Sequence, residues 1–350
     1  MTATAASASA FHVTVQPSGR SFDNLPTEPV LTAAVRQGIG LPYGCKDGAC
    51  GSCKCKLLSG EVTLGAHQDK ALSAEEQAHG IILTCCALPL SDLVLESKQV
   101  TMAGAPPIRK MPSRLASLIR KSSDVMVLRL QLPANDSFIY LAGQYIEFIL
   151  RDGARRSYSM ANAPHSGSEL ELHIRHMPGG KFTDHVFGDM KEKEILRIEG
   201  PYGSFYLREE STKPVILLAS GTGFAPIKAL LEHMQHLGST RPITLYWGGR
   251  RPGDLYMNDW IQQQLECTST LRYIPVVSNA TQEDQWSGRT GFVHRAVLDD
   301  FPDLGGHQVY ACGAPVVIDA ARRDFCTLAH LPEDELFADS FTSEADKAQV

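Results

Sequence analysis

The sequence predicts a multidomain protein in three successive parts: a small α+β domain, an antiparallel β-barrel and an α/β domain with a parallel sheet. Three observations predict it. The chain has 350 residues, more than one ordinary domain holds. Residues 101–108, rich in Pro, Gly and Ala, have the composition of a linker. Near residue 209 the pattern changes from alternating strands and turns to buried-type strands separated by helical stretches.

The composition excludes several classes of protein. Hydrophobic residues make up 43% and charged residues 21% of the chain, as in globular proteins. No apolar run approaches about 18 residues, so we expect no membrane-spanning helix and no membrane partner. The net charge of −6 argues against nucleic acid as a partner. Residues 1–10 lack a cationic start and an apolar run, so we expect a tail in a cytoplasmic protein.

The first domain is expected over residues 11–100. Residues 11–15 alternate in hydrophobicity and predict a strand. Residues 29–37 predict a short helix, opened by a proline and ended by a glycine. Residues 93–100 predict a closing strand. Between the helix and this strand lies a cluster of cysteines.

The second domain is expected over residues 109–208. In residues 125–132 and in 169–175 every second side chain is apolar, so one face of each strand would be buried. Several short strands at this spacing predict a small antiparallel barrel. The segment carries a net charge of +4, against −2 before it and −8 after it. A positive surface would suit a phosphate-bearing ligand, although it is equally typical of an ordinary solvated face.

The third domain is expected over residues 209–350. Apolar strands are predicted at residues 214–219, 243–247, 271–277 and 308–312. Helical stretches separate them, which is typical of a doubly wound parallel sheet.

Four cysteines predict an iron–sulfur site. Their spacing, C-x4-C-x2-C with a fourth cysteine 32 positions later, is that of plant-type [2Fe–2S] clusters. The metal ligands are expected to be Cys45, Cys50, Cys53 and Cys85. Neighbouring glycines, among them Gly48 and Gly51, would let the loop wrap closely around a cluster.

Two other interpretations of these cysteines remain open. A zinc site commonly uses two C-x2-4-C pairs, and the second pair is missing here. Chance clustering of thiols is the other. Cys55 and Cys86 are additional thiols, for which an inert buried role is the common one.

Residues 11 to about 100 resemble the plant-type ferredoxin family. The resemblance rests on YGCKDGACGSC (43–53) and LTCCALP (83–89). It implies a β-grasp fold and assigns Cys45, Cys50, Cys53 and Cys85 as the cluster ligands.

Two segments of the middle part suit a phosphate-bearing cofactor. Arg156-Ser157-Tyr158-Ser159 follows a strand ending near residue 150; alone it is a weak motif that also fits an exposed strand end. HIRHMPGGKFT (173–183) contains a double glycine followed by a lysine and a threonine. These could present N–H groups and a hydroxyl to phosphate.

A glycine turn opens the third part. ASGTGFAP (219–226) directly follows an apolar strand and precedes a helical pattern. Such a turn binds pyrophosphate through free N–H groups and the helix dipole. Position 226 is proline, so the segment departs from the G-x-G-x-x-G fingerprint of the dehydrogenases.

Residues 109–341 resemble the ferredoxin–NADP reductase superfamily. The motifs that carry this are RSYS (156–159), GGKFT (179–183), GPYG (200–203), SGTGFAP (220–226), YWGGR (246–250) and YACGAP (310–315). The whole chain resembles three-part reductases made of a ferredoxin, an FAD barrel and an NAD(P)H domain. In layout it is similar to the reductase components of bacterial aromatic oxygenases, and in motif wording still closer to the CDP-deoxyglucoseen reductases of deoxysugar synthesis.

The resemblance implies roles for single residues. Tyr158 would lie against the isoalloxazine and Ser159 near flavin N5, while Cys312 would lie near the nicotinamide ring. The implied catalytic residues are Tyr158, Ser159, Cys312 and Phe341. The implied cofactor-binding residues are Arg156, Ser157, Tyr158, Ser159, His173, Ile174, Arg175, Gly180, Lys181, Thr183, Gly221, Thr222, Gly223, Pro226 and Gly313. Cys312 also fits a buried thiol, and Phe337 or Phe341 a core phenylalanine.

The implied activity is electron transfer. The chain would take a hydride from NAD(P)H onto FAD and pass single electrons through a [2Fe–2S] cluster to a redox partner, a deoxysugar dehydrase or an oxygenase component. NADH is expected over NADPH because the third part is acidic, although Arg250 and Arg251 favour the extra phosphate. A monomer is expected. The alternatives are a flavin reductase with a ferredoxin carrier module, and a redox sensor.

Overall fold

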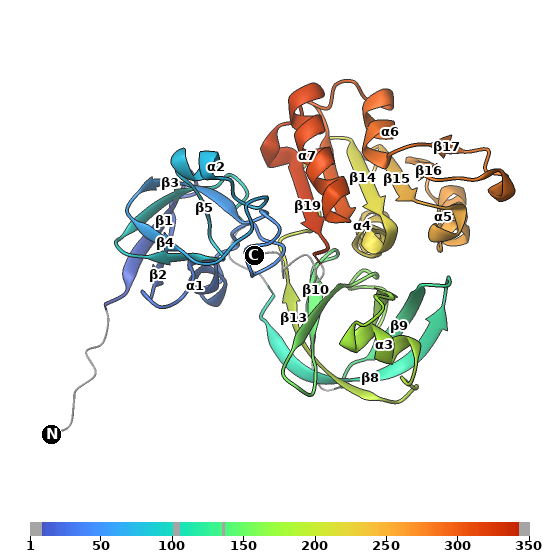
Figure 1. The fold of residues 1–350 in the computed structure, drawn as a ribbon, viewed down its shortest axis with the longest axis horizontal. Helices are drawn as coiled ribbons and strands as arrows, with labels where there is room; N and C mark the ends of the chain where they lie inside the picture. Colours follow the sequence, from blue (N-terminus) through green and yellow to red (C-terminus); the bar gives the residue numbers. More distant parts are fainter. Residues whose placement is uncertain (1–8, 101–105, 135–136, 343–350) are drawn as a thin grey trace. The chain divides into compact units, whose positions relative to one another are not determined.

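The computed structural model describes residues 9–100, 106–134 and 137–342. They form two compact units, one holding residues 9–100 with Thr342, the other formed by the described residues of Pro106–Phe341 (Figure 1). Most of the expected tail, and residues 101–105 of the expected linker, lie outside the described residues. In the described ranges no helix combines the length and the apolar character needed to cross a bilayer.

The first unit is a mixed sheet with a helix packed on it, the β-grasp arrangement. The five strands are β1 (Phe11–Gln16), β2 (Arg20–Asn24), β3 (Lys54–Ser59), β5 (Ile81–Leu83) and β7 (Leu93–Glu96), in the order β2-β1-β7-β3-β5. A two-stranded sheet pairs β4 (Val62–Leu64) with β6 (Ala87–Pro89), and a short helix, α2, spans Ala74–Ala78. The expected helix is α1 (Val30–Arg36), preceded by Pro29 and followed by Gly38 at φ +74°.

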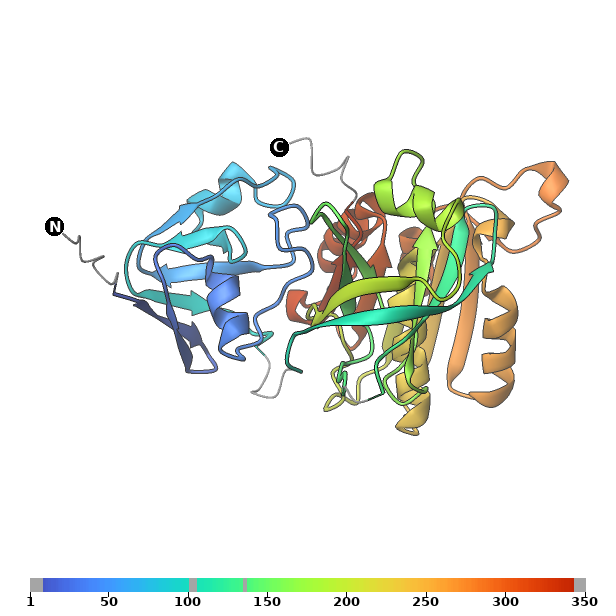
Figure 2. The same ribbon diagram turned by 90° about the horizontal axis from the view of Figure 1, so that it is seen from below.

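The second unit begins with the expected antiparallel barrel. Its strands are β8 (Arg109–Arg120), β9 (Val125–Gln131), β10 (Tyr145–Ile149), β11 (Arg155–Ser159), β12 (Glu169–Arg175) and β13 (Ile195–Tyr202). They pair in the order β11-β10-β13-β8-β9-β12, and the bridge between Met160 and Leu172 joins the two ends. Figure 2 shows β8 as a long teal strand. The alternating apolar side chains Leu128, Leu130 and Leu170 lie in the barrel core, as predicted.

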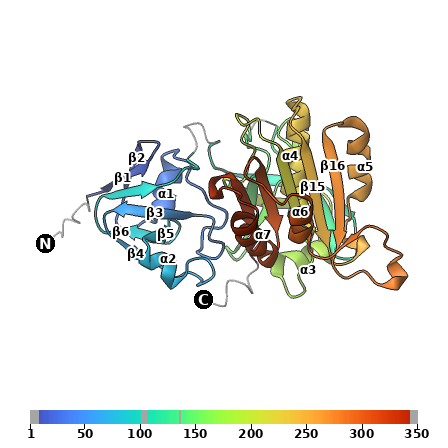
Figure 3. The ribbon, with the colours of Figure 1, turned by 90° about the horizontal axis from the view of Figure 1, so that it is seen from above.

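A parallel sheet follows, again as predicted. Its strands are β14 (Val215–Ser220), β15 (Ile243–Gly249), β16 (Leu271–Val277), β17 (Arg289–Thr290), β18 (Gln308–Gly313) and β19 (Leu336–Ser340), in the order β17-β16-β15-β14-β18-β19. Core residues of α4 (Phe224–His236) and α5 (Asn258–Cys267) share one cluster with the sheet. Those of α6 (Val293–Asp300) and α7 (Pro315–Leu328) share another. The two helix pairs therefore cover opposite faces (Figure 3).

The barrel and the parallel sheet belong to one compact unit. Ala142, Ala163, Phe205 and Leu207, all from the barrel part, are buried in the same apolar cluster as strands β14 and β15. The boundary that the sequence suggests near residue 208 falls inside this unit, because side chains on its barrel side pack into the core of the parallel sheet. The cofactor candidates of both sheets can thus be placed relative to one another.

Candidate cofactor sites

The four expected cluster ligands come together in pairs. Strands β3 and β5 are antiparallel with Lys54 opposite Leu83, and this register brings the flanking Cys53 and Cys85 together, with 3.2 Å between their sulfurs. The other pair is formed within the loop, where the Cys45 N–H donates to the Cys50 sulfur at 3.3 Å. A two-iron cluster held by four thiolates needs two sulfurs for each iron.

The pairs are also in contact with one another. The Cys45 thiol interacts with Cys50 of its own pair and with Cys85 of the other pair. Hydrogen bonds with both cysteines lower the pKa of Cys45. In the described ranges no three His, Cys, Asp or Glu side chains are arranged to hold a single metal ion.

Glycines fix how closely the cysteine loop wraps. Gly48 and Gly51 adopt φ values of +75° and +73°, which side chains rarely permit. A Cβ on Gly48 would lie 2.8 Å from the Cys86 sulfur and 2.9 Å from the Ala66 carbonyl oxygen. The loop therefore packs against residues 66 and 86 without room for a side chain at position 48, which fits a loop wound closely around a cluster.

The two additional thiols lie in different surroundings. Cys55 lies on β3 with its side chain buried, and burial raises the pKa of its thiol to about 12. The Cys86 sulfur lies 3.5 Å from that of Cys85 and donates to the Ala66 carbonyl. Cys55 is thus an inert core thiol, whereas Cys86 lies beside the cluster loop.

Strand β11 presents the expected flavin residues on alternate faces. Tyr158 packs against Phe148 and Phe182, with ring centroids 5.8 and 5.5 Å away. Burial raises the pKa of Tyr158, so its hydroxyl stays protonated at neutral pH. Arg156 is half-buried and Ser157 exposed. The strand therefore offers an aromatic side chain and a cation on one face.

The double glycine forms the turn before α3 (Lys181–Phe187). A Cβ on Gly180 would lie 2.6 Å from the Thr183 hydroxyl oxygen. That hydroxyl donates to the Met177 carbonyl at 2.8 Å and accepts the Met177 N–H at 3.2 Å. Thr183 therefore closes the turn with its hydroxyl, and Lys181 extends outward to Asp152, 2.6 Å away.

Strand β12 connects the barrel to the glycine turn of the parallel sheet. The Arg175 guanidinium donates to Asp124 at 2.8 Å, and one of its nitrogens lies 2.8 Å from where a Cβ of Gly221 would be. Ile174 points into the barrel core. His173 is buried, and its ring nitrogens contact the Tyr256 hydroxyl at 2.8 Å and Glu171 at 3.1 Å. Of the three, Arg175 lies beside the expected nucleotide turn.

The glycine turn interlocks with the end of β18. A Cβ on Gly223 would lie 2.1 Å from the Cys312 carbonyl oxygen, and one on Gly313 would lie 2.5 Å from the Ser220 carbonyl oxygen. Both positions therefore require glycine. Thr222 is half-buried between the two glycines of its turn.

Sequence reasoning missed a residue that supports this turn. The indole N–H of the fully buried Trp247 donates to the Gly221 carbonyl at 3.0 Å, and its ring stacks on Phe224 at 4.0 Å. Phe224 begins α4, and Pro226 lies in the first helical turn, as expected. The YWGGR motif that contains this tryptophan was the available signal.

Asp339, which sequence reasoning also missed, joins the barrel to the parallel sheet. The Ser159 hydroxyl donates to the Asp339 carboxylate at 3.4 Å, and the Cys312 sulfur lies 4.0 Å from the same oxygen. The parallel pairing of β18 with β19 places Cys312 next to Asp339. Burial and the Asp339 charge raise the pKa of the Cys312 thiol, so it keeps its proton at neutral pH.

The two C-terminal phenylalanines differ in surroundings. Phe337 is buried and stacks on Tyr310, with ring centroids 4.8 Å apart. Phe341 is half-buried, and its N–H donates to the Gly313 carbonyl at 2.8 Å. Phe337 is therefore a core residue, while Phe341 lies beside the turn that follows Cys312.

Three family models match successive parts of the chain. The 2Fe-2S iron-sulfur cluster binding domain matches residues 13–90, the oxidoreductase FAD-binding domain residues 112–206, and the oxidoreductase NAD-binding domain residues 217–323. The four paired cysteines fall in the first match, RSYS and GGKFT in the second, and the glycine turn and Cys312 in the third.

Similar proteins share the whole layout. The chain is 40% identical over 333 residues to the CDP-6-deoxy-L-threo-D-glycero-4-hexulose-3-dehydrase reductase of Yersinia pseudotuberculosis, covering 94% of this chain and 98% of that one. It is 32% identical to the phenol 2-monooxygenase reductase component DmpP of Pseudomonas sp., covering 97% and 96%. The crystal structure of the Amycolatopsis cytochrome P450 reductase GcoB matches with a TM-score of 0.77 and 31% identity, covering 95% and 99%.

These matches agree with the geometry of each site. The cofactors are FAD, a [2Fe–2S] cluster and NAD(P)H, and the protein is an oxidoreductase that transfers electrons from NAD(P)H through FAD and the cluster. The chain belongs to the family of ferredoxin-type NAD(P)H reductases, in which a plant-type [2Fe–2S] domain is fused to a ferredoxin–NADP reductase-like module.

Proposed function

We propose that this reductase delivers its electrons to a deoxysugar dehydrase, as a reductase of the CDP-6-deoxy-delta-3,4-glucoseen type. The observation that carries this is the difference in sequence identity between the two kinds of relative. The chain is 40% identical to the Yersinia dehydrase reductase, but 32% and 34% identical to the reductases of a phenol monooxygenase and a terephthalate dioxygenase, at similar coverage. An oxygenase component is the second candidate partner, because those oxygenase reductases also match along nearly the whole chain.

The test compares two acceptors. The reduced protein is mixed with a purified CDP-6-deoxyhexulose 3-dehydrase and, separately, with the oxygenase component of a phenol hydroxylase, and cluster reoxidation is followed by absorbance. We expect faster reoxidation by the dehydrase. Faster reoxidation by the oxygenase component would reverse the assignment. If FAD instead leaves the protein on gel filtration and free flavin is reduced, the chain is a flavin reductase.

Bound FAD supplies the conversion of a two-electron hydride donor into a source of single electrons. Tyr158 would provide an aromatic surface for the flavin, and Asp339 holds the Ser159 hydroxyl that would hydrogen-bond to it. Cys312 keeps its proton, so it brings no extra negative charge to the nicotinamide side. Phe341, whose N–H donates to the Gly313 carbonyl, would shield the flavin.

The phosphates of the two nucleotides have separate supports in this proposal. Arg156, Arg175 and Lys181 supply positive charge for FAD. The turn that Thr183 closes supplies backbone N–H groups. The other residues proposed to contribute to binding are Ser157, His173, Ile174 and Gly180 for FAD, and Gly221, Thr222, Gly223, Pro226 and Gly313 for the nicotinamide nucleotide. His173 acts through Glu171 and Tyr256 rather than by contact with FAD.

NADH is the proposed electron donor. Arg251 donates to Asp284 at 2.9 Å and to Thr281 at 3.0 Å, so its guanidinium is already engaged. The net charge of −8 on residues 209–350 also disfavours the additional 2′-phosphate of NADPH. We also propose that the protein is a monomer and that it works in the cytoplasm, whose reducing conditions keep clustered thiols from forming disulfides. The proposed domain limits are 11–100, 109–208 and 209–350.

A further inference from the structure

A buried lysine lies at the junction between the barrel and the parallel sheet. The Lys228 side chain is 5% exposed, and its ammonium lies 5.0 Å from the Trp260 ring centre. A charge removed from water is costly unless it is paired and hydrogen-bonded. Lys228 therefore has a structural or functional reason to be at this position.

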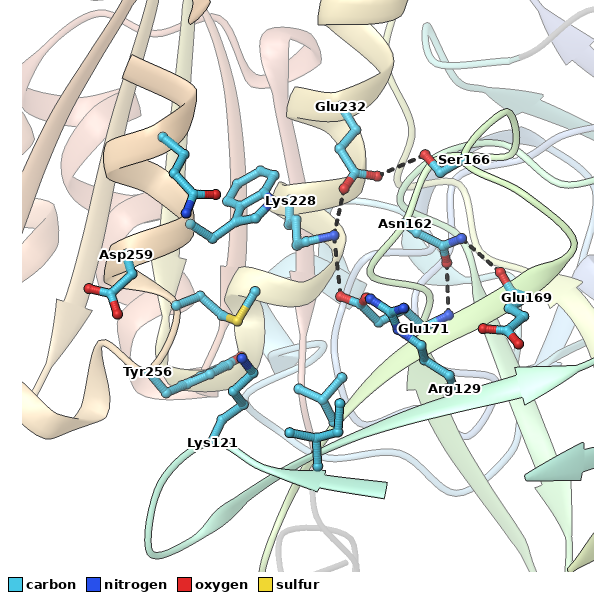
Figure 4. A pocket seen from close by; sticks show the side chains of 15 residues that line it. Lys121, Arg129, Asn162, Ser166, Glu169, Glu171, Lys228, Glu232, Tyr256 and Asp259 are labelled. Atoms are coloured by element: carbon cyan, nitrogen blue, oxygen red, sulfur yellow. Dashed lines mark hydrogen bonds and ion pairs between the residues drawn. The ribbon is translucent and has the colours of Figure 1, made fainter. Parts of the chain in front are cut away.

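The partners of Lys228 come from its own helix and from the barrel. Its ammonium donates to Glu232 on the same helix at 2.6 Å, to the Ala161 carbonyl beyond β11 at 3.1 Å, and it pairs with Glu171 on β12 at 3.2 Å. Glu232 in turn accepts the Ala163 N–H at 2.9 Å. Figure 4 shows Lys228 between the two carboxylates, with helix α4 on one side and the barrel on the other. The helix is thus tied to the barrel by charge-assisted hydrogen bonds.

Glu171 is the shared centre of this network. One carboxylate oxygen faces Lys228 and the His173 ring nitrogen, and the other accepts from Arg129 at 3.3 Å. Burial raises the pKa of Glu171, but the hydrogen bond with His173 and the charge of Lys228 outweigh burial and lower that pKa to about 2. Through His173 the network reaches Tyr256, in the loop before α5.

The network joins the same elements that carry the two nucleotide sites. Lys228 lies five residues after Gly223, about 7.5 Å along the helix at 1.5 Å per residue. Glu171 lies four residues before Arg175 on β12. A cavity of about 500 Å³ adjoins the network, lined by residues of the barrel and of helices α4 and α5, including Arg129 and Trp260. Apolar packing, of Ala163 among others, holds other parts of the junction, whereas beside this cavity the charged contacts of Lys228 hold it.

We propose that Lys228 is a positioning residue for hydride transfer: its contacts with Glu171 and Ala161 hold the nucleotide-binding turn in register with the flavin-binding barrel. The proposal rests on the NAD(P)H-to-FAD transfer of this family. A displacement of about 1 Å in such a geometry can cost about a hundredfold in rate. A contact that ties the two elements therefore influences rate more than affinity for either nucleotide.

The test uses the full-length holoprotein in anaerobic stopped-flow, following FAD reduction by NADH through the loss of flavin absorbance. In Lys228→Met we expect the limiting rate of FAD reduction to fall about tenfold or more, with FAD content and the Kd for NADH within about twofold. We also expect weaker long-wavelength absorbance of the NADH complex, which reports ring overlap. Lys228→Arg keeps the charge beside a cavity with room for it and should recover most of the rate.

Lys213→Met is the matched control. Lys213 pairs with Glu335 at 2.5 Å within the parallel-sheet part, so its loss removes an ion pair without touching the junction, and the reduction rate should stay unchanged. Wild-type rates in Lys228→Met would overturn the proposal. So would an Arg variant as slow as the Met variant, because the charge would then be irrelevant.

If Lys228→Met does not fold, Glu171→Gln provides the test, because it keeps the shape of the side chain and removes its charge. A slower reduction with FAD retained supports the proposal, and a wild-type rate refutes it. If the unmutated protein does not reduce FAD with NADH, the assigned activity itself fails, which is a separate outcome.

Discussion

Replacing Gly223 by alanine tests whether the nucleotide turn depends on close backbone contact. The new Cβ would lie 2.1 Å from the Cys312 carbonyl oxygen and 2.7 Å from Gly313 Cα, whereas Cβ contacts under 3.0 Å essentially never occur. Both neighbours are backbone, so the turn and the end of β18 must separate by about 1 Å. Such overpacking costs about 1–3 kcal/mol. For a unit of this size that lowers the Tm by about 2–12 °C.

The function should suffer more than the stability. A shift of about 1 Å between the nucleotide turn and the Cys312 segment predicts a kcat/KM for NADH reduced by about a hundredfold. The assays are thermal unfolding followed by flavin fluorescence, and steady-state ferricyanide reduction. Gly306→Ala is the control, because a Cβ there has nothing within 4 Å and its φ is not positive. If Gly223→Ala matches Gly306→Ala in both Tm and kcat/KM, the close-contact reasoning is wrong.

Three further predictions concern the cluster, the donor and pH. Cys50→Ser should lose the cluster yet keep FAD and NADH-dependent ferricyanide reduction, while cytochrome c reduction falls steeply; full cytochrome c activity without a cluster would contradict this order of transfer. Steady-state kinetics should favour NADH, and a tenfold preference for NADPH in kcat/KM would show that Arg250 or Arg251 binds the extra phosphate. The lowered pKa of Glu171, about 2 against the usual 4.5, contributes about 3 kcal/mol of stability above pH 4.5 that is lost as pH falls toward 2. In urea unfolding from pH 7 to pH 3, Glu171→Gln should therefore show a flatter dependence than the unmutated protein, and equal slopes would refute it.

Local patterns in the sequence predicted the elements and the cofactor motifs. The alternating residues of β9 and β12 and the apolar strands of the parallel sheet were recognisable because side-chain period and burial depend on neighbours in the chain. The spacing of Cys45, Cys50 and Cys53 predicted the cluster loop for the same reason. Cys53 and Cys85 are far apart in sequence and are brought together by the pairing of β3 with β5. Cys85 was therefore predicted from the known motif and not from local patterns.

Only the tertiary structure showed which residues of different motifs contact one another. Asp339 reaches Ser159 across 180 positions of sequence, and Lys228 reaches from helix α4 to Glu171 on the barrel strand β12. No periodicity marks such pairs, because they depend on strand order and on how the barrel packs against α4. Thr183 fits a phosphate-binding pattern, yet its hydroxyl closes its own turn. Sequence determines which residues are available at each turn, whereas the folded structure, through local and long-range contacts, determines which of their atoms remain free to bind.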